Sequence, residues 1–310
     1  MRRITRLLLL PAALALALSA CGSDTGGSTT TLVEVTTTTP PSPTTTEQAI
    51  TTTTSPATTT TAPVQAGVAV YFLLDELEED AGGPFMVPVH RDLSDTGDIA
   101  TLAVQLLMEG PTDDETAGTP AISTAIPDGT RVLGVTLDGG VATIDLSGEF
   151  DDGGGSASMF ARLAQVVFTL TRIDEVDEVA FEIDGLPVTV FSSEGIELDA
   201  PQGRSDYYEQ LPPIFVDSPA WGEPVASPIH VFGLSNVFEA VSQMMLTDGD
   251  GLTLFEDAVM ATCGNGCWGE WEVEVPYTVD REQFGAVIVW EYSAQDGSRM
   301  SIREYPVYLR

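Results

Sequence analysis

Three cysteines and two histidines offer most of the reactive side-chain chemistry in this 310-residue sequence. Cys263 and Cys267 enclose the segment Gly264-Asn265-Gly266, and its two glycines allow the chain to turn back tightly enough for a local disulfide. A metal site is the alternative interpretation, but a structural zinc ion needs further Cys or His ligands. Only His90 and His230 remain to supply them. The spacing favours a Cys263–Cys267 disulfide in an oxidising compartment and no metal centre.

The two histidines do not form a recognisable catalytic group with any nucleophile. A serine or cysteine nucleophile needs a base within hydrogen-bond reach. His90 lies in the run Pro-Val-His-Arg-Asp, His230 lies on an alternating apolar stretch, and the sequence has no Gly-x-Ser-x-Gly elbow. We therefore predict that the protein is not an enzyme and needs no cofactor.

Polar residues within apolar segments are the remaining candidates for a binding site. Asp145, Ser147 and Glu149 alternate along one stretch, where they form either a recognition edge or a solvent-facing, turn-capping set. Asn236, Phe238 and Glu239 lie close together before a predicted strand. They form either a partner-binding loop with an aromatic anchor or a structural corner with Phe238 in the core.

A row of exposed tryptophans would indicate a different ligand, because indole rings stack on sugars. The sequence has four tryptophans, and alternation predicts that at least half of them belong to the core. They are Trp221, Trp268, Trp271 and Trp290.

The N-terminus has the layout of an export signal. Arg2, Arg3 and Arg6 precede an apolar run at 7–18 that is shorter than an ordinary membrane-spanning helix. The run ends in Leu-Ser-Ala-Cys, which resembles the bacterial lipobox, in which the cysteine is acylated and the chain is cut before it. The resemblance implies a signal peptide at 1–20, lipidation of Cys21 and a location on the extracytoplasmic face of the cell membrane.

Residues 21–66 are dominated by Thr, Ser and Pro, and such a segment cannot bury enough apolar surface to offset the entropy of ordering. We expect a disordered tether between the lipid and the folded part. The formal net charge of −35 excludes nucleic acid as a partner, because phosphate groups are repelled by an acidic surface.

The elements that position these candidates divide into two groups. Residues 67–199 alternate strand patterns with two helix patterns, and this order indicates an α+β layer with helices on one face of a sheet. Asp98 is the predicted N-cap of the first helix and Gly110-Pro111 its end, with Ile99 on the apolar face. The second helix, at 156–171, has Phe160 on its apolar face. The predicted strands lie at 68–74, 86–89, 131–137, 141–146, 179–183 and 187–191.

From residue 213 onward only short strand patterns remain, separated by Asp-Gly and other turn signals. About seven strands in about 100 residues predict an all-β sandwich of immunoglobulin type. Residues 200–212 are the expected hinge and 213–310 the second domain. The predicted strands lie at 214–216, 229–232, 241–246, 252–261, 268–275, 286–293 and 301–308.

Both groups resemble known domains. The first resembles the GerMN domain of sporulation and spore-germination proteins, through Val70-Tyr71-Phe72-Leu73, Thr124-Ala125-Ile126-Pro127, Ala142-Thr143-Ile144-Asp145-Leu146-Ser147 and Gln165-Val166-Val167-Phe168-Thr169-Leu170-Thr171. The second resembles the immunoglobulin-like domain that accompanies GerMN, through Pro213-Ile214-Phe215-Val216, Asn236-Val237-Phe238-Glu239-Ala240 and Pro306-Val307-Tyr308-Leu309.

The resemblance implies a non-catalytic, lipid-anchored envelope protein that acts as a binding or adaptor module. It further implies sporulation- or germination-type assemblies, or envelope signalling, as its setting. The expected partners are the membrane, through the lipid, and an envelope protein or the cell wall. A peptidoglycan- or glycan-binding protein is the alternative function.

Overall fold

The computed structural model describes residues 67–75, 82–93 and 97–310. The predicted signal peptide, Cys21 and the Thr-rich tether lie outside these residues. No helix in the described ranges is long and apolar enough to cross a membrane.

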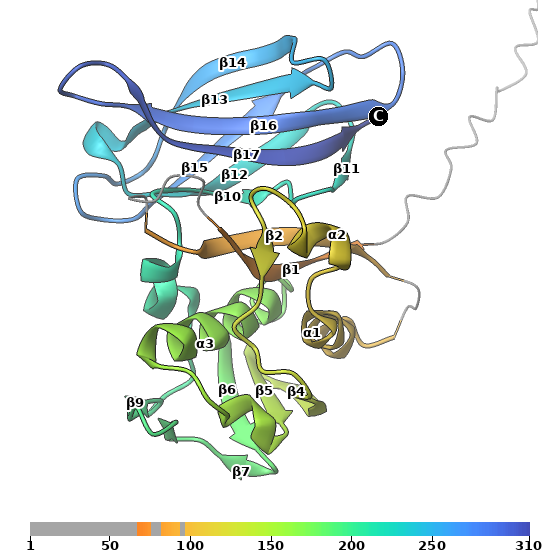
Figure 1. Cartoon of the computed structure of the whole chain (residues 1–310), viewed down its shortest axis with the longest axis vertical. Coiled ribbons are helices and arrows are strands. Elements are labelled where there is room, and N and C mark those ends of the chain that lie inside the picture. The colour runs from red at the N-terminus through yellow and green to blue at the C-terminus, as the bar shows by residue number, and fades with distance from the viewer. Residues whose placement is uncertain (1–66, 76–81, 94–96) are drawn as a thin grey trace, which may run out of the picture. The chain divides into compact units, whose positions relative to one another are not determined.

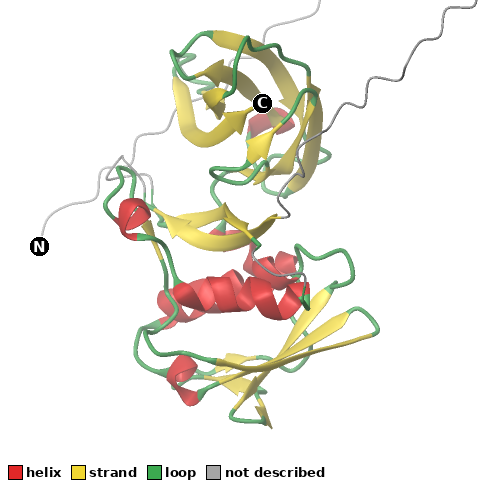
Figure 2. Ribbon diagram, turned by 90° about the vertical axis from the view of Figure 1, so that its right-hand side faces the viewer, coloured by secondary structure: helices red, strands yellow, loops and turns green. Residues whose placement is uncertain are grey.

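The first part of the chain contains two sheets with the main helices between them (Figures 1 and 2). One sheet has the strand order β2-β1-β3 and the other the order β4-β5-β6-β7. The strands are β1 (Gly67–Leu74), β2 (Phe85–Asp92), β3 (Ile122–Ser123), β4 (Val132–Asp138), β5 (Val141–Leu146), β6 (Glu178–Ile183) and β7 (Leu186–Pro187). The helices are α1 (Ile99–Glu109), α2 (Asp113–Thr116), α3 (Ser156–Leu170) and the 3-10 turn η1 (Gly148–Asp151). A separate hairpin follows, formed by β8 (Val190–Phe191) and β9 (Ile196–Glu197).

Local signals in the sequence set the ends of α1 and the hairpin β4–β5. The Asp98 carboxylate accepts a hydrogen bond from the Thr101 N–H at 3.2 Å, so Asp98 is the N-cap as predicted. Gly110 ends the helix with a φ of 79°, which glycine adopts without strain. Asp138 pairs with Val141 across the two-residue turn Gly139-Gly140, which joins the predicted strands at 131–137 and 141–146 into a hairpin.

The α+β class is confirmed, but the strands form two sheets rather than one. The buried helix α3 connects β5 to β6, which run parallel to each other, and it also packs against β1 of the other sheet. The alternation of apolar residues along a strand predicts which residues face a core, but it does not predict which strands pair, so the sequence could not distinguish one sheet from two. Two assignments to buried faces were wrong, because Ile99 is 47% exposed and Phe160 is 38% exposed.

The second part is the predicted all-β sandwich. One sheet has the order β10-β12-β15 and the other the order β11-β17-β16-β13-β14. Their facing side chains form the core, with Val231, Met244, Val289 and Tyr305 fully buried. The strands are β10 (Ile214–Ser218), β11 (Pro224–Val225), β12 (Ile229–Ser235), β13 (Val241–Asp248), β14 (Thr253–Met260), β15 (Gly269–Val275), β16 (Gln283–Tyr292) and β17 (Arg299–Leu309).

A buried polar cluster joins the two parts, which belong to one compact unit. Its centre is Asp217 on β10, which is 6% exposed and accepts a hydrogen bond from the hydroxyl of Tyr71 on β1. Arg204, at the start of the connecting 3-10 segment η2 (Arg204–Gln210), donates to Asp217 at 2.7 Å and to the Tyr71 hydroxyl at 3.1 Å. The same guanidinium group donates to the Phe168 carbonyl of α3 at 3.2 Å. Arg204 therefore bonds to both parts of the chain at once.

Backbone hydrogen bonds add a second connection. The Trp221 N–H donates to the Pro88 carbonyl at 2.8 Å, and the His90 N–H donates to the Trp221 carbonyl at 2.9 Å. These bonds extend the edge of β2 by one bridge to the loop after β10. The junction is thus held by main-chain as well as side-chain contacts.

Candidate functional site

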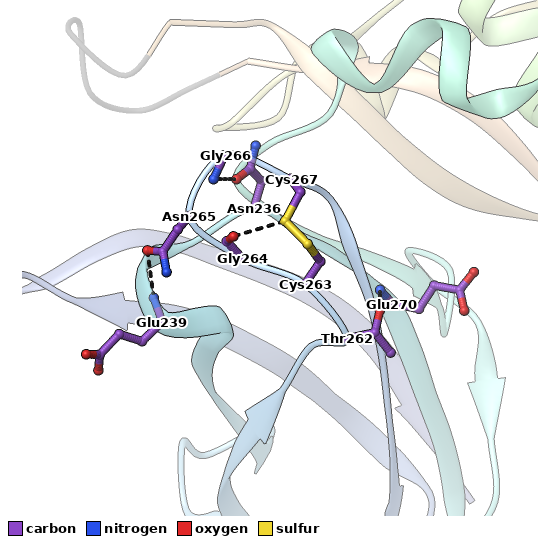
Figure 3. The surroundings of a disulfide bond; sticks show 9 residues. All are labelled: Asn236, Glu239, Thr262, Cys263, Gly264, Asn265, Gly266, Cys267 and Glu270. Carbon is purple, nitrogen blue, oxygen red and sulfur yellow. Dashed lines mark hydrogen bonds between the residues drawn. A yellow bond between two sulfur atoms is a disulfide. The ribbon is translucent and has the colours of Figure 1, made fainter.

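Two loops at the same end of the sandwich are bonded to each other, and we call them the stapled loops (Figure 3). The first contains Asn236 and the short 3-10 turn η3 (Phe238–Ala240), and the second is the segment Cys263–Cys267. A disulfide closes the second loop, with the two cysteine Cα atoms 5.8 Å apart. The sulfur chemistry expected from the sequence is therefore present here.

Asparagine side chains connect the two loops. The Gly266 N–H donates to the Asn236 side-chain oxygen at 3.0 Å, and the Glu239 N–H donates to the Asn265 side-chain oxygen at 3.1 Å (Figure 3). A main-chain bond from the Asn265 N–H to the Val237 carbonyl, at 3.1 Å, adds to them. Each loop thus satisfies polar backbone groups of the other, which fixes their relative position.

The stapled loops hold an unusual backbone conformation. Glu239, Ala240 and Asn265 have φ values of 57°, 59° and 60°, in the left-handed region that non-glycine residues seldom occupy. At Gly264 a Cβ atom would lie 2.5 Å from the Ala240 nitrogen, so the close approach of the loops requires glycine there. Strain of this kind persists only where the surroundings enforce it, and it is concentrated at functional sites.

Phe238 projects from this rigid frame with 58% of its surface exposed. The alternative in which Phe238 is a core residue at a structural corner is therefore wrong. An exposed aromatic ring on a pre-ordered backbone loses little conformational entropy when a partner covers it. Exposed aromatic side chains of this kind often carry much of the binding energy at protein interfaces.

The other sequence candidates lie in the first part of the chain and make bonds within it. The hydroxyl of Ser147 is buried and accepts from the Arg131 N–H at 2.9 Å, which ties the ends of β4 and β5. Asp145 accepts from the Gly185 N–H at 2.9 Å. Hydrogen bonding lowers the pKa of Glu149, first from Ser147 and then, more weakly, from Arg131. Asp145, Ser147 and Glu149 belong to a different sheet from the stapled loops and do not combine with them.

The two histidines lie apart and each faces a carboxylate. His90 Nε2 is 3.4 Å from Asp92, and His230 Nε2 is 3.1 Å from Glu272. Within the described ranges no three His, Cys, Asp or Glu side chains gather in a way that could hold a metal ion.

The four tryptophans form no exposed row among the described residues. Trp271 and Trp290 are buried in the sandwich, at 3% and 0% exposure. Trp268 is half-buried and its ring packs on Tyr208 at 5.6 Å between centroids. Trp221 is also half-buried, at the junction described above.

Sequence reasoning missed a cavity of about 550 Å³ on the outer face of the β10-β12-β15 sheet. Its floor is formed by outward-facing side chains of β12, one wall by η2 and the other by β15. Its lining includes Arg204, Tyr208, Phe232, Leu234, Glu270 and Glu272, together with Met260 and Thr262 from the end of β14 and the loop after it. The alternation of β12 and β15 was visible in the sequence, but the wall from η2 depends on how the two parts pack.

Comparison with known families identifies both parts. Residues 69–189 match the Germane family model, described as "Sporulation and spore germination". Residues 213–298 match the Gmad2 model, described as "Immunoglobulin-like domain of bacterial spore germination". The chain therefore carries a GerMN-type domain followed by a spore-germination immunoglobulin-like domain, as the sequence motifs indicated.

Two solved structures from Bacillus subtilis are similar to this chain over about half of its length. The first GerMN domain of the sporulation protein GerM has 20% sequence identity and a TM-score of 0.38, with coverage of 46% of this chain and 99% of that one. The tandem GerMN domains of the same protein have 24% identity and a TM-score of 0.36, with coverage of 47% of this chain and 49% of that one. A search of curated proteins gave no match.

Proposed function

We propose that this protein is a non-catalytic, lipid-anchored envelope protein that binds another envelope protein through the stapled loops, with Phe238 as the anchor residue. The observation that carries the proposal is an exposed aromatic ring on two loops fixed by a disulfide, reciprocal asparagine bonds and left-handed backbone. Interfaces concentrate their binding energy in a few aromatic residues of this kind. The spore-germination domains support a sporulation- or germination-type assembly as the setting, with envelope signalling as a second setting.

The anchoring half of the proposal rests on the Leu-Ser-Ala-Cys motif. Replacing Cys21 with Ala should remove the acylation site and release the protein from the membrane fraction. Fractionation of cells followed by immunoblotting measures this directly. Full membrane retention of the variant would contradict the lipid anchor.

The binding half is tested by site-specific photocrosslinking in intact cells. A benzophenone amino acid replaces Phe238 in one strain and Phe284 in a control strain. Phe284 is a suitable control because it is also an aromatic residue, lies on strand β16 and is 69% exposed. We expect a discrete protein adduct at position 238 that is absent at position 284. Replacing Cys263 and Cys267 with Ser should weaken that adduct by releasing the loop frame.

Two outcomes would overturn this assignment. Adducts to wall fragments alone would transfer the function to glycan binding. Equal adducts at both positions would show that the stapled loops confer no selectivity.

A further inference from the structure

Strand β15 is an open edge of the sandwich. It ends the sheet β10-β12-β15, and its only described backbone bonds beyond β12 occur at Glu270. There the Thr262 N–H donates to the Glu270 carbonyl at 2.9 Å, and the Glu270 N–H donates to the Thr262 hydroxyl at 2.9 Å. The backbone of Glu270 therefore faces away from β12.

The backbone groups of further residues along β15 point the same way as those of Glu270. Because every second residue of an antiparallel strand points its N–H and carbonyl groups to the same side, Glu272 and Glu274 also face away from β12. No described residue makes a hydrogen bond to these backbone groups. The edge thus offers a row of free donors and acceptors, which an added strand would satisfy.

The side chains of the same residues give this edge its charge. Glu270, Glu272 and Glu274 are exposed, whereas Trp271 and Val275 between and beyond them are buried. The three carboxylates therefore line one face of the strand, beside the cavity whose floor contains Phe232. His230, at 3.1 Å, is the only described side chain bonded to any of them.

Two arginines near the cavity already face the carboxylate of Asp217. Arg204 is bonded to Asp217, and the Arg172 guanidinium lies 3.9 Å from the same carboxylate and 5.1 Å from the Phe232 ring centroid. Among the residues that the structure describes, no arginine forms an ion pair with the carboxylates of β15. The charge beside the cavity is therefore uneven: the arginines are paired with Asp217, whereas the glutamates of β15 are not paired with any described arginine. A cationic side chain is attracted to the β15 side.

We propose that the β15 edge binds an extended peptide segment of a protein partner, with Lys or Arg at alternate positions. The backbone of the segment pairs with Glu272 and Glu274. Its basic side chains lie opposite the glutamates as cross-strand ion pairs, and their aliphatic stems extend toward Phe232 and Leu234. This surface is distinct from Phe238, so its test does not depend on the stapled loops.

A short peptide of alternating lysine and valine, labelled with a dye, is the probe. Its binding to the purified full chain is measured by fluorescence anisotropy. The matched control is the same peptide N-methylated on the amides that would face β15, because it keeps the charge and loses the backbone donors. We expect the methylated peptide to bind about tenfold more weakly, as for the loss of one to two hydrogen bonds.

Protein variants separate charge from strand pairing. Glu272→Gln removes one cross-strand ion pair and should weaken binding by about two- to fivefold. Glu272→Pro removes an outward-facing N–H without breaking the ladder to β12 and should weaken binding by about tenfold. Glu256→Gln, on the edge strand of the other sheet, should leave binding unchanged.

Equal binding of the methylated and unmethylated peptides would overturn the proposal, because it would show that net charge alone attracts them. Undetectable binding of the unmethylated peptide would overturn it as well, and would identify the glutamate row as protection against edge pairing. If Glu272→Pro does not fold, the two peptides on the unaltered chain still decide the question.

Discussion

Replacing Arg204 with Met tests whether the polar cluster makes the two domains unfold together. The variant removes hydrogen bonds to Asp217, the Tyr71 hydroxyl and the Phe168 carbonyl, and it leaves the Asp217 carboxylate buried at 6% exposure. Breaking one side of a buried ion pair costs about 3–5 kcal/mol. Because the Tyr71 hydroxyl and Arg172 still face Asp217, we expect the lower part of this range, about 3 kcal/mol.

The chain supplies its own domain-specific probes for this measurement. All four tryptophans lie in the immunoglobulin-like domain, so their fluorescence reports its unfolding. The three α-helices of the described residues lie in the GerMN-type domain, so far-ultraviolet circular dichroism reports that domain. In urea, the unaltered chain should give coincident transitions, whereas Arg204→Met should separate them.

A surface arginine provides the control. Arg131 lies 3.4 Å from Glu149 with 64% of its side chain exposed, so Arg131→Met should change the free energy of unfolding by less than about 0.5 kcal/mol. If Arg204→Met changes stability no more than this control, and both probes still coincide, the cluster does not couple the domains.

Three further predictions concern pH and redox state. Burial raises the pKa of Glu115, but hydrogen bonds from Arg91 and the Thr112 N–H outweigh this effect and lower the pKa. The ionised Glu115 carboxylate therefore stabilises the fold above its ordinary pKa of about 4.3, and this contribution is lost in acid. Arg91→Met should flatten the acid limb of a urea-midpoint series and cost about 1–2 kcal/mol at neutral pH; an unchanged acid limb would contradict this. Burial raises the pKa of Tyr71, so the neutral hydroxyl stabilises the fold below its ordinary pKa of about 10, and this contribution is lost as the pH rises above it. Tyr71→Phe should therefore reduce the loss of stability at alkaline pH in the same urea series. An equally steep loss would show that Tyr71 is not its cause. Reducing the Cys263–Cys267 disulfide should lower the stability of the immunoglobulin-like domain by about 2 kcal/mol, measured by tryptophan fluorescence in a urea titration. An unchanged urea midpoint would show that the loop is held without the disulfide.

Much of the local structure followed from the sequence alone. The cap at Asp98, the end of α1 at Gly110 and the hairpin turn after Asp138 each depend on residues within a few positions of one another. Such contacts are formed by the backbone and one or two side chains, so distant parts of the chain do not alter them. The domain order and the all-β character of the second domain followed from strand and turn periodicity in the same way.

Burial of particular side chains was harder to predict. Phe160 and Ile99 fit the apolar faces of their helices and are nevertheless exposed at 38% and 47%. Periodicity predicts which residues share a helix face, but the elements that pack against the helix decide which residues on that face become buried. Phe238 left two interpretations open for the same reason, and its 58% exposure excludes the one that placed its ring in the core.

Residue types and spacing thus determined which chemistry the side chains offer, whereas the tertiary structure determined which of these side chains are exposed and which lie together. The sequence by itself indicated the disulfide, the aromatic candidate at Phe238 and the lack of a recognisable catalytic group. Only the tertiary structure brought Tyr71, Arg204 and Asp217 together, over separations of up to 146 residues. It also left the edge of β15 open, because pairing between strands is a long-range choice that alternation along one strand does not specify.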